Sequence, residues 1–303
     1  MSAVPVFYRD RRSGHLVEEP VFAGRLLFWS YDNRLGRAIG QFLLRQPLFS
    51  RVYGWLNRRG VSRRRIDGFV RAMNVDAAVC RRPPASHASF ADFFIREIDL
   101  AQRPVDPDPR VCTAPADGRI YVLPVVERDR TFTIKGGRFN LSEFLVDDAL
   151  TARFAGGAMA VIRLHLADYH HFHFPVAGRA GRPRLIPGRL HAVGPYGRRW
   201  PVPFFSENRR YATLIESDAF GLVCMAEIGA CTVGSIRQGF QPTSAVSKGS
   251  RKGYFELGGS TVVLIFERGA MEFDDDLRIS SAEGVETYVR MGERIGCSRR
   301  GGL

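Results

Sequence analysis

The sequence predicts an α+β protein, in which a β-rich, mostly antiparallel domain follows an amphipathic helical N-terminal region. Three observations support this. Apolar residues recur at spacings of three to four between about residues 20 and 100, which is typical of helices. The segment AQRPVDPDPR has three prolines in ten residues and is expected to be extended. From about residue 111 the chain consists of short β-type runs separated by Gly, Pro and Asp. We therefore expect a helical region at 1–104 and a β-rich domain at 105–303.

The helical region is basic as well as apolar. Its apolar residues include Trp29 and Trp55, and seven arginines are interleaved with them, at positions 25, 34, 37, 45, 51, 58 and 59. A helix of this kind can lie in a membrane surface, with its apolar face in the acyl boundary and its arginines near the phosphates. The alternative is a helical cap that packs on the β-rich domain with a solvated Arg face. A second helix is expected from about Ser89 to Ile98, with Ser89 as its N-cap.

The β-rich domain is marked by five runs with strand character. Apolar and β-branched residues dominate each run, and turn-forming residues separate them. The runs are GRIYVLPVV, GAMAVIRLHL, YATLIES, GLVCMAEIGACTVGSI and STVVLIFE. Such runs fit the strands of a compact antiparallel fold.

Composition restricts the class of partner and the compartment. The net charge is +13, and nearly all basic residues are Arg, so nucleic acid and an anionic lipid surface are both plausible polyanions. An Arg-rich proteome would give the same balance. No nucleic-acid recognition module is visible, which favours the lipid. Five cysteines without a CxxC pair, no signal peptide and no long apolar run predict a cytoplasmic protein, soluble or bound to a membrane surface.

Three short segments carry residue types suited to chemistry. APADGRI (114–120) contains an Asp-Gly turn dipeptide, which is also common in plain turns. DYHHFHFP (168–175) holds three of the seven histidines within four residues, a pattern that suits acid–base work or metal binding. In GYFELGGST (253–261), two glycines precede Ser260, which suits either a plain hairpin turn or a bend that leaves the Gly259 carbonyl open to attack by the next side chain.

Together these segments resemble the phosphatidylserine decarboxylase family, from about residue 60 to about 270. The likeness covers FADFFIREI and the following RPVD, then APADGRI, DYHHFHFPVAG, FFSENRRYATLIES, AEIGACTVGSI and FELGGSTVVLIF. The family's cleavage motif is often written Leu-Gly-Ser-Thr. Here Gly258 stands in the Leu position, and the Gly259–Ser260 pair at the cleavage point is intact.

The resemblance implies a self-cleaving enzyme. Ser260 would attack the Gly259 carbonyl, and the matching family positions supply its base: Asp117 orients the imidazole of His173, which takes the hydroxyl proton. The ester that forms would break by elimination. This step releases residues 1–259 and turns Ser260 into a pyruvoyl group at the head of residues 260–303.

The implied reaction is that of a carboxy-lyase, from phosphatidylserine to phosphatidylethanolamine. The substrate amine would form a Schiff base with the pyruvoyl carbonyl, which draws electrons from the bond to the carboxylate. No external cofactor and no metal is expected. His170 matches a family position linked to decarboxylation, and we expect it to protonate the carbanion or to contact the carboxylate. His171 falls where the pattern tolerates other residues and is expected to be a satisfied or exposed polar side chain.

The expected partners are phosphatidylserine, an anionic membrane surface and the two cleavage fragments, 1–259 and 260–303, with no nucleic acid. A homo-oligomer is compatible with the resemblance, and the expected location is peripheral, on the cytoplasmic side of the membrane. Relatives that act on other serine-headgroup lipids or on soluble amino acids share these motifs.

Two other classes fit parts of the sequence. The His-x-His element with Asp168 could bind zinc in a β-rich metallopeptidase, although this leaves Gly259-Ser260 unexplained. The PADG-type turn also occurs in lipoyl-like carrier domains, but no Lys stands at the turn where a lipoyl carrier needs one.

Overall fold

The computed structural model describes residues 5–20, 47–134, 137–189, 204–229, 236–258 and 260–300. Two expectations therefore fall outside the described residues. One is the conformation of Gly259 at the expected cleavage point, and the other is most of the basic amphipathic segment, at 21–46.

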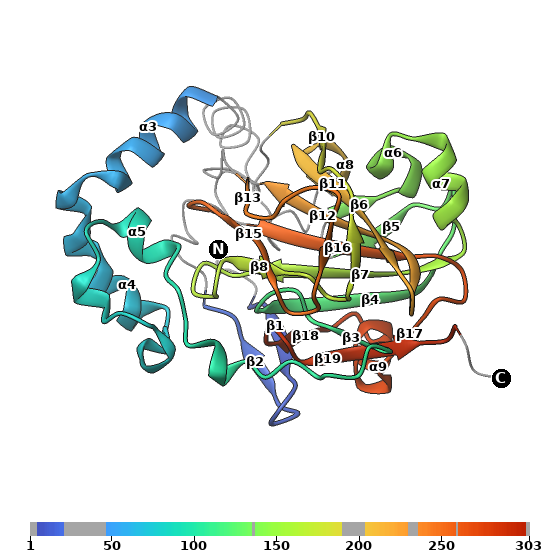
Figure 1. The fold of residues 1–303 in the computed structure, drawn as a ribbon. Coiled ribbons are helices and arrows are strands. Elements are labelled where there is room, and N and C mark those ends of the chain that lie inside the picture. The colour runs from blue at the N-terminus through green and yellow to red at the C-terminus, as the bar shows by residue number, and fades with distance from the viewer. Residues whose placement is uncertain are drawn as a thin grey trace.

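An 11-stranded sheet forms the centre of the molecule, and its strands are antiparallel except for one parallel pair, β1 with β18 (Figure 1). In spatial order the strands are β14 (Ser244–Val246), β9 (Gly178–Ala180), β11 (Arg210–Ser217), β12 (Gly221–Gly229), β16 (Ser260–Phe266), β7 (Gly157–Leu164), β4 (Gly118–Val126), β18 (Glu286–Val289), β1 (Phe7–Asp10) and β2 (Leu16–Glu18), while β10 (Arg184–Ile186) pairs with β11. The five runs singled out in the sequence supply β4, β7, β11, β12 and β16. The predicted fold class is confirmed.

Three smaller sheets surround the main one. The one that matters for the site contains β13 (Ile236–Gln238), β15 (Arg251–Phe255) and β8 (His171–His173). The others are β17 (Met271–Phe273) with β19 (Arg294–Ser298) and β3 (Val111–Thr113), and β5 (Phe132–Ile134) with β6 (Gly137–Phe139). Because β15 precedes β16 in the chain, residues 256–258 lead from the small sheet toward the centre of the main sheet.

The N-terminal helices form a layer at one end of the sheet, at the left of Figure 1. They are α3 (Pro47–Arg58), α4 (Ile66–Ala72) and α5 (Phe90–Phe94), joined by 3-10 turns at Gly60–Arg65, Ala77–Val79 and Pro84–Ser86, and followed by one at Leu100–Gln102. The other helices in the described part of the chain are α6 (Leu141–Leu145), α7 (Asp148–Phe154), α8 (Phe204–Glu207) and α9 (Asp275–Ala282). The Ser89 side chain caps α5 by accepting a hydrogen bond from the Asp92 N–H at 3.1 Å, as expected.

Two helical expectations need correction. The helix predicted from Ser89 to Ile98 ends at Phe94, because the chain turns there and Ile98 forms a β-bridge with Cys80. Residues 5–20, placed in the helical region, form β1 and β2 instead. These strands make a hairpin that turns at Gly14, whose φ of 73° favours glycine, and β1 adds to the edge of the main sheet beside β18.

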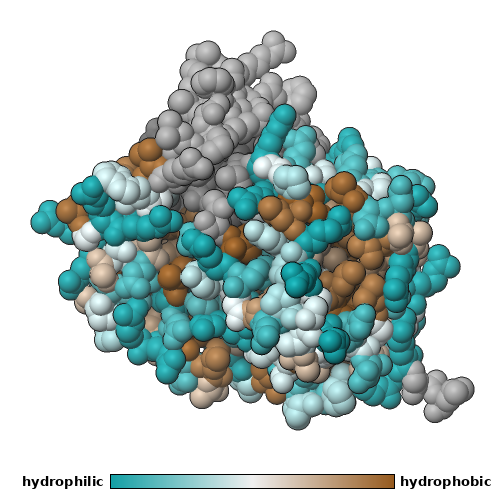
Figure 2. All heavy atoms as spheres, turned by 45° about the horizontal axis from the view of Figure 1, so that its top comes forward, coloured by the Kyte–Doolittle hydropathy of each residue, from teal (hydrophilic) through white to brown (hydrophobic). Residues whose placement is uncertain are grey.

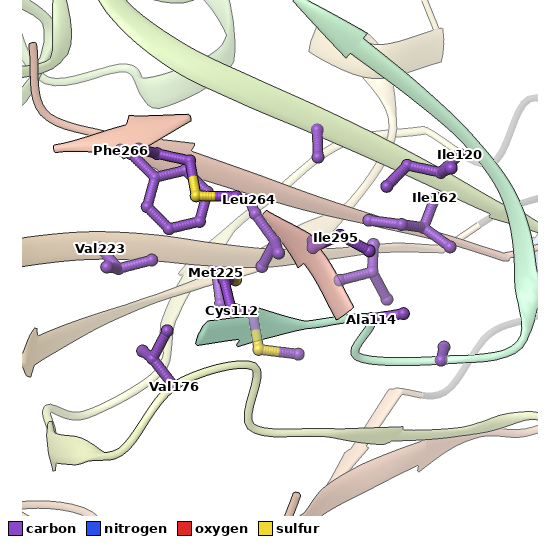
Figure 3. Packing of buried hydrophobic residues seen from close by; sticks show 14 of the residues in the cluster. Cys112, Ala114, Ile120, Ile162, Val176, Val223, Met225, Leu264, Phe266 and Ile295 are labelled. Carbon is purple, nitrogen blue, oxygen red and sulfur yellow. The ribbon is translucent and has the colours of Figure 1, made fainter. Parts of the chain in front are cut away.

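The main sheet is buried on both faces. Val262, Leu264 and Phe266 of β16 pack in one apolar cluster, whereas Val263 and Ile265 pack in another on the opposite face. Figure 3 shows part of the first cluster, where Leu264 and Phe266 lie near Val223 and Met225. Burial on both faces explains the unbroken apolar run after Ser260. A third cluster joins α4 and α5 to Leu257, three residues before Ser260.

Candidate active site

Ser260 is the first residue of β16 and is completely buried. In the sheet it pairs with Gly229 of β12 on one side and Leu164 of β7 on the other. Gly258, two residues earlier, has a φ of 134°, a conformation that residues with a Cβ rarely adopt. Gly258, the first glycine of the Gly-Gly-Ser motif, thus permits the bend that brings the chain into the strand. Backbone pairing with β12 and β7 therefore holds Ser260 in place independently of its covalent bond to the preceding residue.

His170 is the residue in contact with Ser260. Its Nδ1 lies 3.2 Å from the Ser260 Oγ, and both side chains are fully buried. The ring of Phe94, at the end of α5, stacks on the imidazole with the centroids 3.9 Å apart. Burial lowers the pKa of His170 well below its usual value, and the nearby Arg96 charge adds to this effect. The imidazole is therefore neutral at pH 7 and can accept a proton.

His173 lies at the end of β8, with both ring nitrogens in contacts. Nδ1 donates to the Gly249 carbonyl at 2.9 Å, so Nε2 is the acceptor, 3.2 Å from the Tyr169 hydroxyl. Burial lowers the pKa of His173 to about 4, with smaller opposing contributions from the Gly249 carbonyl and the Asp117 charge. His173 is therefore also neutral at pH 7.

Asp117, at the turn before β4, is paired with a buried arginine. Its carboxylate accepts two hydrogen bonds from Arg103, at 3.2 and 2.9 Å, and a third from the Met291 N–H at 2.8 Å. The expected relay from Asp117 through His173 to Ser260 is thus not assembled among the described residues. The physical reason is that Arg103, in the RPVD segment, offers Asp117 a bidentate charged partner, while the Tyr169 hydroxyl occupies the nitrogen that His173 would need.

His171 is not exposed, and only one of its two ring nitrogens is satisfied within the described residues, so the expectation of a satisfied or exposed side chain is met in part. Its side chain is buried, and Nε2 donates to the Ile95 carbonyl at 2.9 Å. The ring stacks on Tyr169 at 4.8 Å with an interplanar angle of 8°. Nδ1 has no hydrogen-bond partner among the described residues. His171 therefore packs in the wall of the site and is not at the surface.

A buried ion pair connects the two sheets that carry the site. Lys252 of β15 donates to Glu227 of β12 at 2.8 Å, and both side chains are fully buried. Gln238 of β13 completes the group, because its amide oxygen accepts from Lys252 at 2.8 Å and its amide nitrogen donates to Glu227 at 2.7 Å. Strand β15 pairs with β8, which carries His173. This group therefore holds the three-stranded sheet of β13, β15 and β8 against the main sheet, which carries Ser260.

Beside the site lies a cleft of about 440 Å³, between the loop before His170 and the segment after α4. Asp117 and Tyr169 line it, together with the arginines Arg96, Arg103, Arg119 and Arg290. Sequence reasoning missed Arg96, Arg103 and Tyr169, although all three lie inside segments that carried the family resemblance. Their position next to the motif residues was the one sequence feature that could have indicated a place in the site.

Two features of the described residues bear on the alternatives. No group of three or more His, Cys, Asp or Glu side chains among them is placed to hold a metal ion. Within the same residues, no helix is both long and apolar enough to cross a membrane.

Comparison with known proteins gives one consistent family. The family model for phosphatidylserine decarboxylase matches residues 90–297. The chain is 42% identical over 296 residues to a phosphatidylserine decarboxylase proenzyme of Chlamydia muridarum, covering 98% of each chain. It is 41% identical, with the same coverage, to the proenzyme of Chlamydia trachomatis serovar L2, and 38% identical over 291 residues to that of Chlamydia felis, covering 96% of this chain and 97% of the relative.

Proposed function

The chain belongs to the phosphatidylserine decarboxylase family, and we propose that it converts phosphatidylserine to phosphatidylethanolamine with a pyruvoyl group made from its own Ser260. The observation that carries the proposal is the buried Ser260 hydroxyl, 3.2 Å from the neutral imidazole of His170. The proenzyme names of the relatives agree with a chain that must be cut before it acts.

The position of Ser260 suits a group that must stay in place after the backbone is cut. Strand β16 lies between β12 and β7, so its pairing does not depend on the bond to Gly259. Farther along the same fragment, β18 pairs with β4 and β1, and β19 pairs with β3. Residues 260–303 would therefore stay bound to residues 1–259. The pyruvoyl ketone would supply the electron sink that weakens the bond to the substrate carboxylate.

Cleavage begins when the Ser260 oxygen attacks the Gly259 carbonyl and loses its proton. The Gly259–Ser260 amide becomes an ester, and the Ser260 nitrogen becomes an amine. Elimination across the Cα–Cβ bond of residue 260 then releases Gly259 as a free carboxylate. Water replaces the nitrogen of the unsaturated residue, and ammonia leaves. The attack needs a base near the hydroxyl and an oriented carbonyl, the elimination needs removal of the Cα proton, and the last step consumes one water.

Two assignments of that base are distinguishable. The family resemblance gives the role to His173 with Asp117, and His173 must then exchange the Tyr169 hydroxyl for that of Ser260. We adopt this assignment for cleavage. His170 already contacts Ser260 and stays beside the same atoms after cleavage. We assign it proton delivery to the substrate carbon that loses carbon dioxide, since a group of the decarboxylation step must lie next to residue 260. Because its imidazole is neutral at rest, it would relay a proton taken up from water.

We propose that the protein lies peripherally on the cytoplasmic side of a membrane, and the N-terminal helices support contact with a membrane surface. Around α3, the apolar side chains of Val52, Trp55 and Leu56 are exposed. The Arg59 guanidinium lies 3.9 Å from the centroid of the Trp55 ring, and the arginines at 63–65 are exposed as well. Figure 2 shows apolar residues beside hydrophilic ones on the side where Figure 1 places α3.

This mixture of apolar and basic side chains suits an anionic headgroup layer. Sedimentation with phosphatidylserine vesicles but not with phosphatidylcholine vesicles would support binding to an anionic membrane surface. Equal binding to both vesicles would contradict it.

The test of the proposal is the Ser260→Ala variant. We expect a folded chain that is neither cleaved nor active, because the nucleophile and the source of the ketone are both lost. Ser86→Ala, at an exposed serine near α5, is the matched control and should be cleaved like the wild type. Cleavage or activity in Ser260→Ala would contradict the proposal.

A further inference from the structure

Arg96, two residues after α5, is a buried cation held by backbone groups. Its side chain lies inside the protein, with the residue 4% exposed. Nη2 donates to the Asp168 carbonyl at 3.0 Å and also to the Ala167 carbonyl. The guanidinium carbon lies 5.0 Å from the centroid of the Phe93 ring. These contacts fix the guanidinium against the loop that leads directly to His170.

No carboxylate among the described residues forms an ion pair with this guanidinium. The two carboxylates whose charges act on the pKa of Arg96 already have other partners. Asp168 is paired with Arg119, and Asp117 is paired with Arg103. The Cys80 thiol forms a side-chain hydrogen bond with Arg96, but burial raises the pKa of this thiol, so it offers no negative charge. Nη1 of Arg96 has no hydrogen-bond partner in the described part of the chain. A buried charge with an unused N–H is costly unless it serves a bound group of opposite charge.

The guanidinium lies within electrostatic reach of the reacting residues. Its charge lowers the pKa of both His170 and His171 in addition to the effect of burial. Arg96 also lines the cleft of about 440 Å³ beside Tyr169 and Asp117. An anion bound by Arg96 would therefore lie at the inner end of a cleft that borders the site.

We propose that Arg96 binds the phosphodiester of the lipid headgroup, an inference that rests on the proposed decarboxylation of phosphatidylserine. The substrate offers two anions, a phosphodiester and a carboxylate. A cation on the carboxylate would stabilise the charge that must disperse as carbon dioxide leaves, and so would oppose the reaction. A cation on the phosphodiester does not oppose the loss of carbon dioxide, because the charge of the phosphodiester is unchanged by the reaction. Arg also presents a planar pair of donors that suits phosphate oxygens.

The experiment uses the full chain with Arg96→Gln and Arg96→Lys, and exposed Arg138→Gln as the matched control. Cleavage is read from intact mass, which needs no substrate, so a failure of self-processing is separate from a failure of binding. In the cleaved enzyme we expect Arg96→Gln to raise KM for phosphatidylserine about 10-fold to 100-fold with a smaller change in kcat. Arg96→Lys should keep part of the affinity, and Arg138→Gln should match the wild type.

Two soluble probes separate the phosphodiester from the carboxylate. Glycerophosphoethanolamine carries a phosphodiester but no carboxylate, whereas free serine carries a carboxylate but no phosphodiester. We expect glycerophosphoethanolamine to inhibit the wild type and to lose that effect in Arg96→Gln. The same binding is measured by calorimetry on uncleaved Ser260→Ala with and without Arg96→Gln, so a variant that fails to cleave is still tested. Unchanged glycerophosphoethanolamine affinity, or a loss confined to serine, would overturn the assignment.

Discussion

The buried pair between Lys252 and Glu227 is expected to be a main support of the site. Replacing Glu227 with Gln keeps the shape but leaves the Lys252 ammonium without a carboxylate. Both groups are fully buried, and their only other polar partner described is Gln238. Removing one partner of such a pair generally costs about 3–5 kcal/mol, because the remaining charge is uncompensated. The change should therefore lower the free energy of unfolding by this amount.

The measurement is calorimetry in the uncleaved Ser260→Ala background, so that a single chain unfolds. At about 1.6 °C per kcal/mol for a protein of this size, we expect Tm to fall by roughly 5–8 °C. The double variant Glu227→Gln/Lys252→Met removes both charges and should recover at least half of the loss. Glu283→Gln, at an exposed ion pair with Arg9, is the matched control and should cost less than about 1 kcal/mol. A fall in Tm no larger than that of the control, or no recovery in the double variant, would refute the reasoning.

Three further predictions concern the site. His170→Ala should be cleaved but should lose most decarboxylase activity, because proton delivery is lost; activity close to the wild-type level would remove His170 from the mechanism. His173→Ala and Asp117→Asn should block or slow cleavage, as seen on denaturing gels, and normal rates in both would favour His170 as the base. Stability should be full above about pH 6.5 and fall toward pH 4, because the lowered pKa values of His170 and His173 mean that the unfolded chain binds protons the folded chain excludes. Urea midpoints at pH 7 and pH 5 test this, and equal values would contradict it.

The sequence predicted the main strands well, because a buried strand depends on local pattern. The apolar run after Ser260 is long and β-branched, so it predicts a buried strand. The family resemblance also implies that His170 and Ser260 share one site, and the structure brings them within hydrogen-bonding distance.

Pairing between distant side chains was harder to predict. Asp117 has two candidate partners, His173 and Arg103, and only the folded chain shows that the bidentate arginine is in contact. The place of β1 beside β18 depends on contacts across more than 270 residues, which no local pattern encodes. Arg96 appeared as one more basic residue of an amphipathic segment, whereas its burial depends on the loop at 167–168.

Intact mass of freshly purified protein under denaturing conditions tests the central claim most directly. The account predicts two species, residues 1–259 and residues 260–303. The smaller should be lighter than the unmodified peptide by one ammonia, and its blocked N-terminus should react with hydrazine as a ketone does. A single full-length chain in an active preparation, or a fragment that begins with an unmodified Ser260, would contradict the claim that Ser260 becomes the pyruvoyl group.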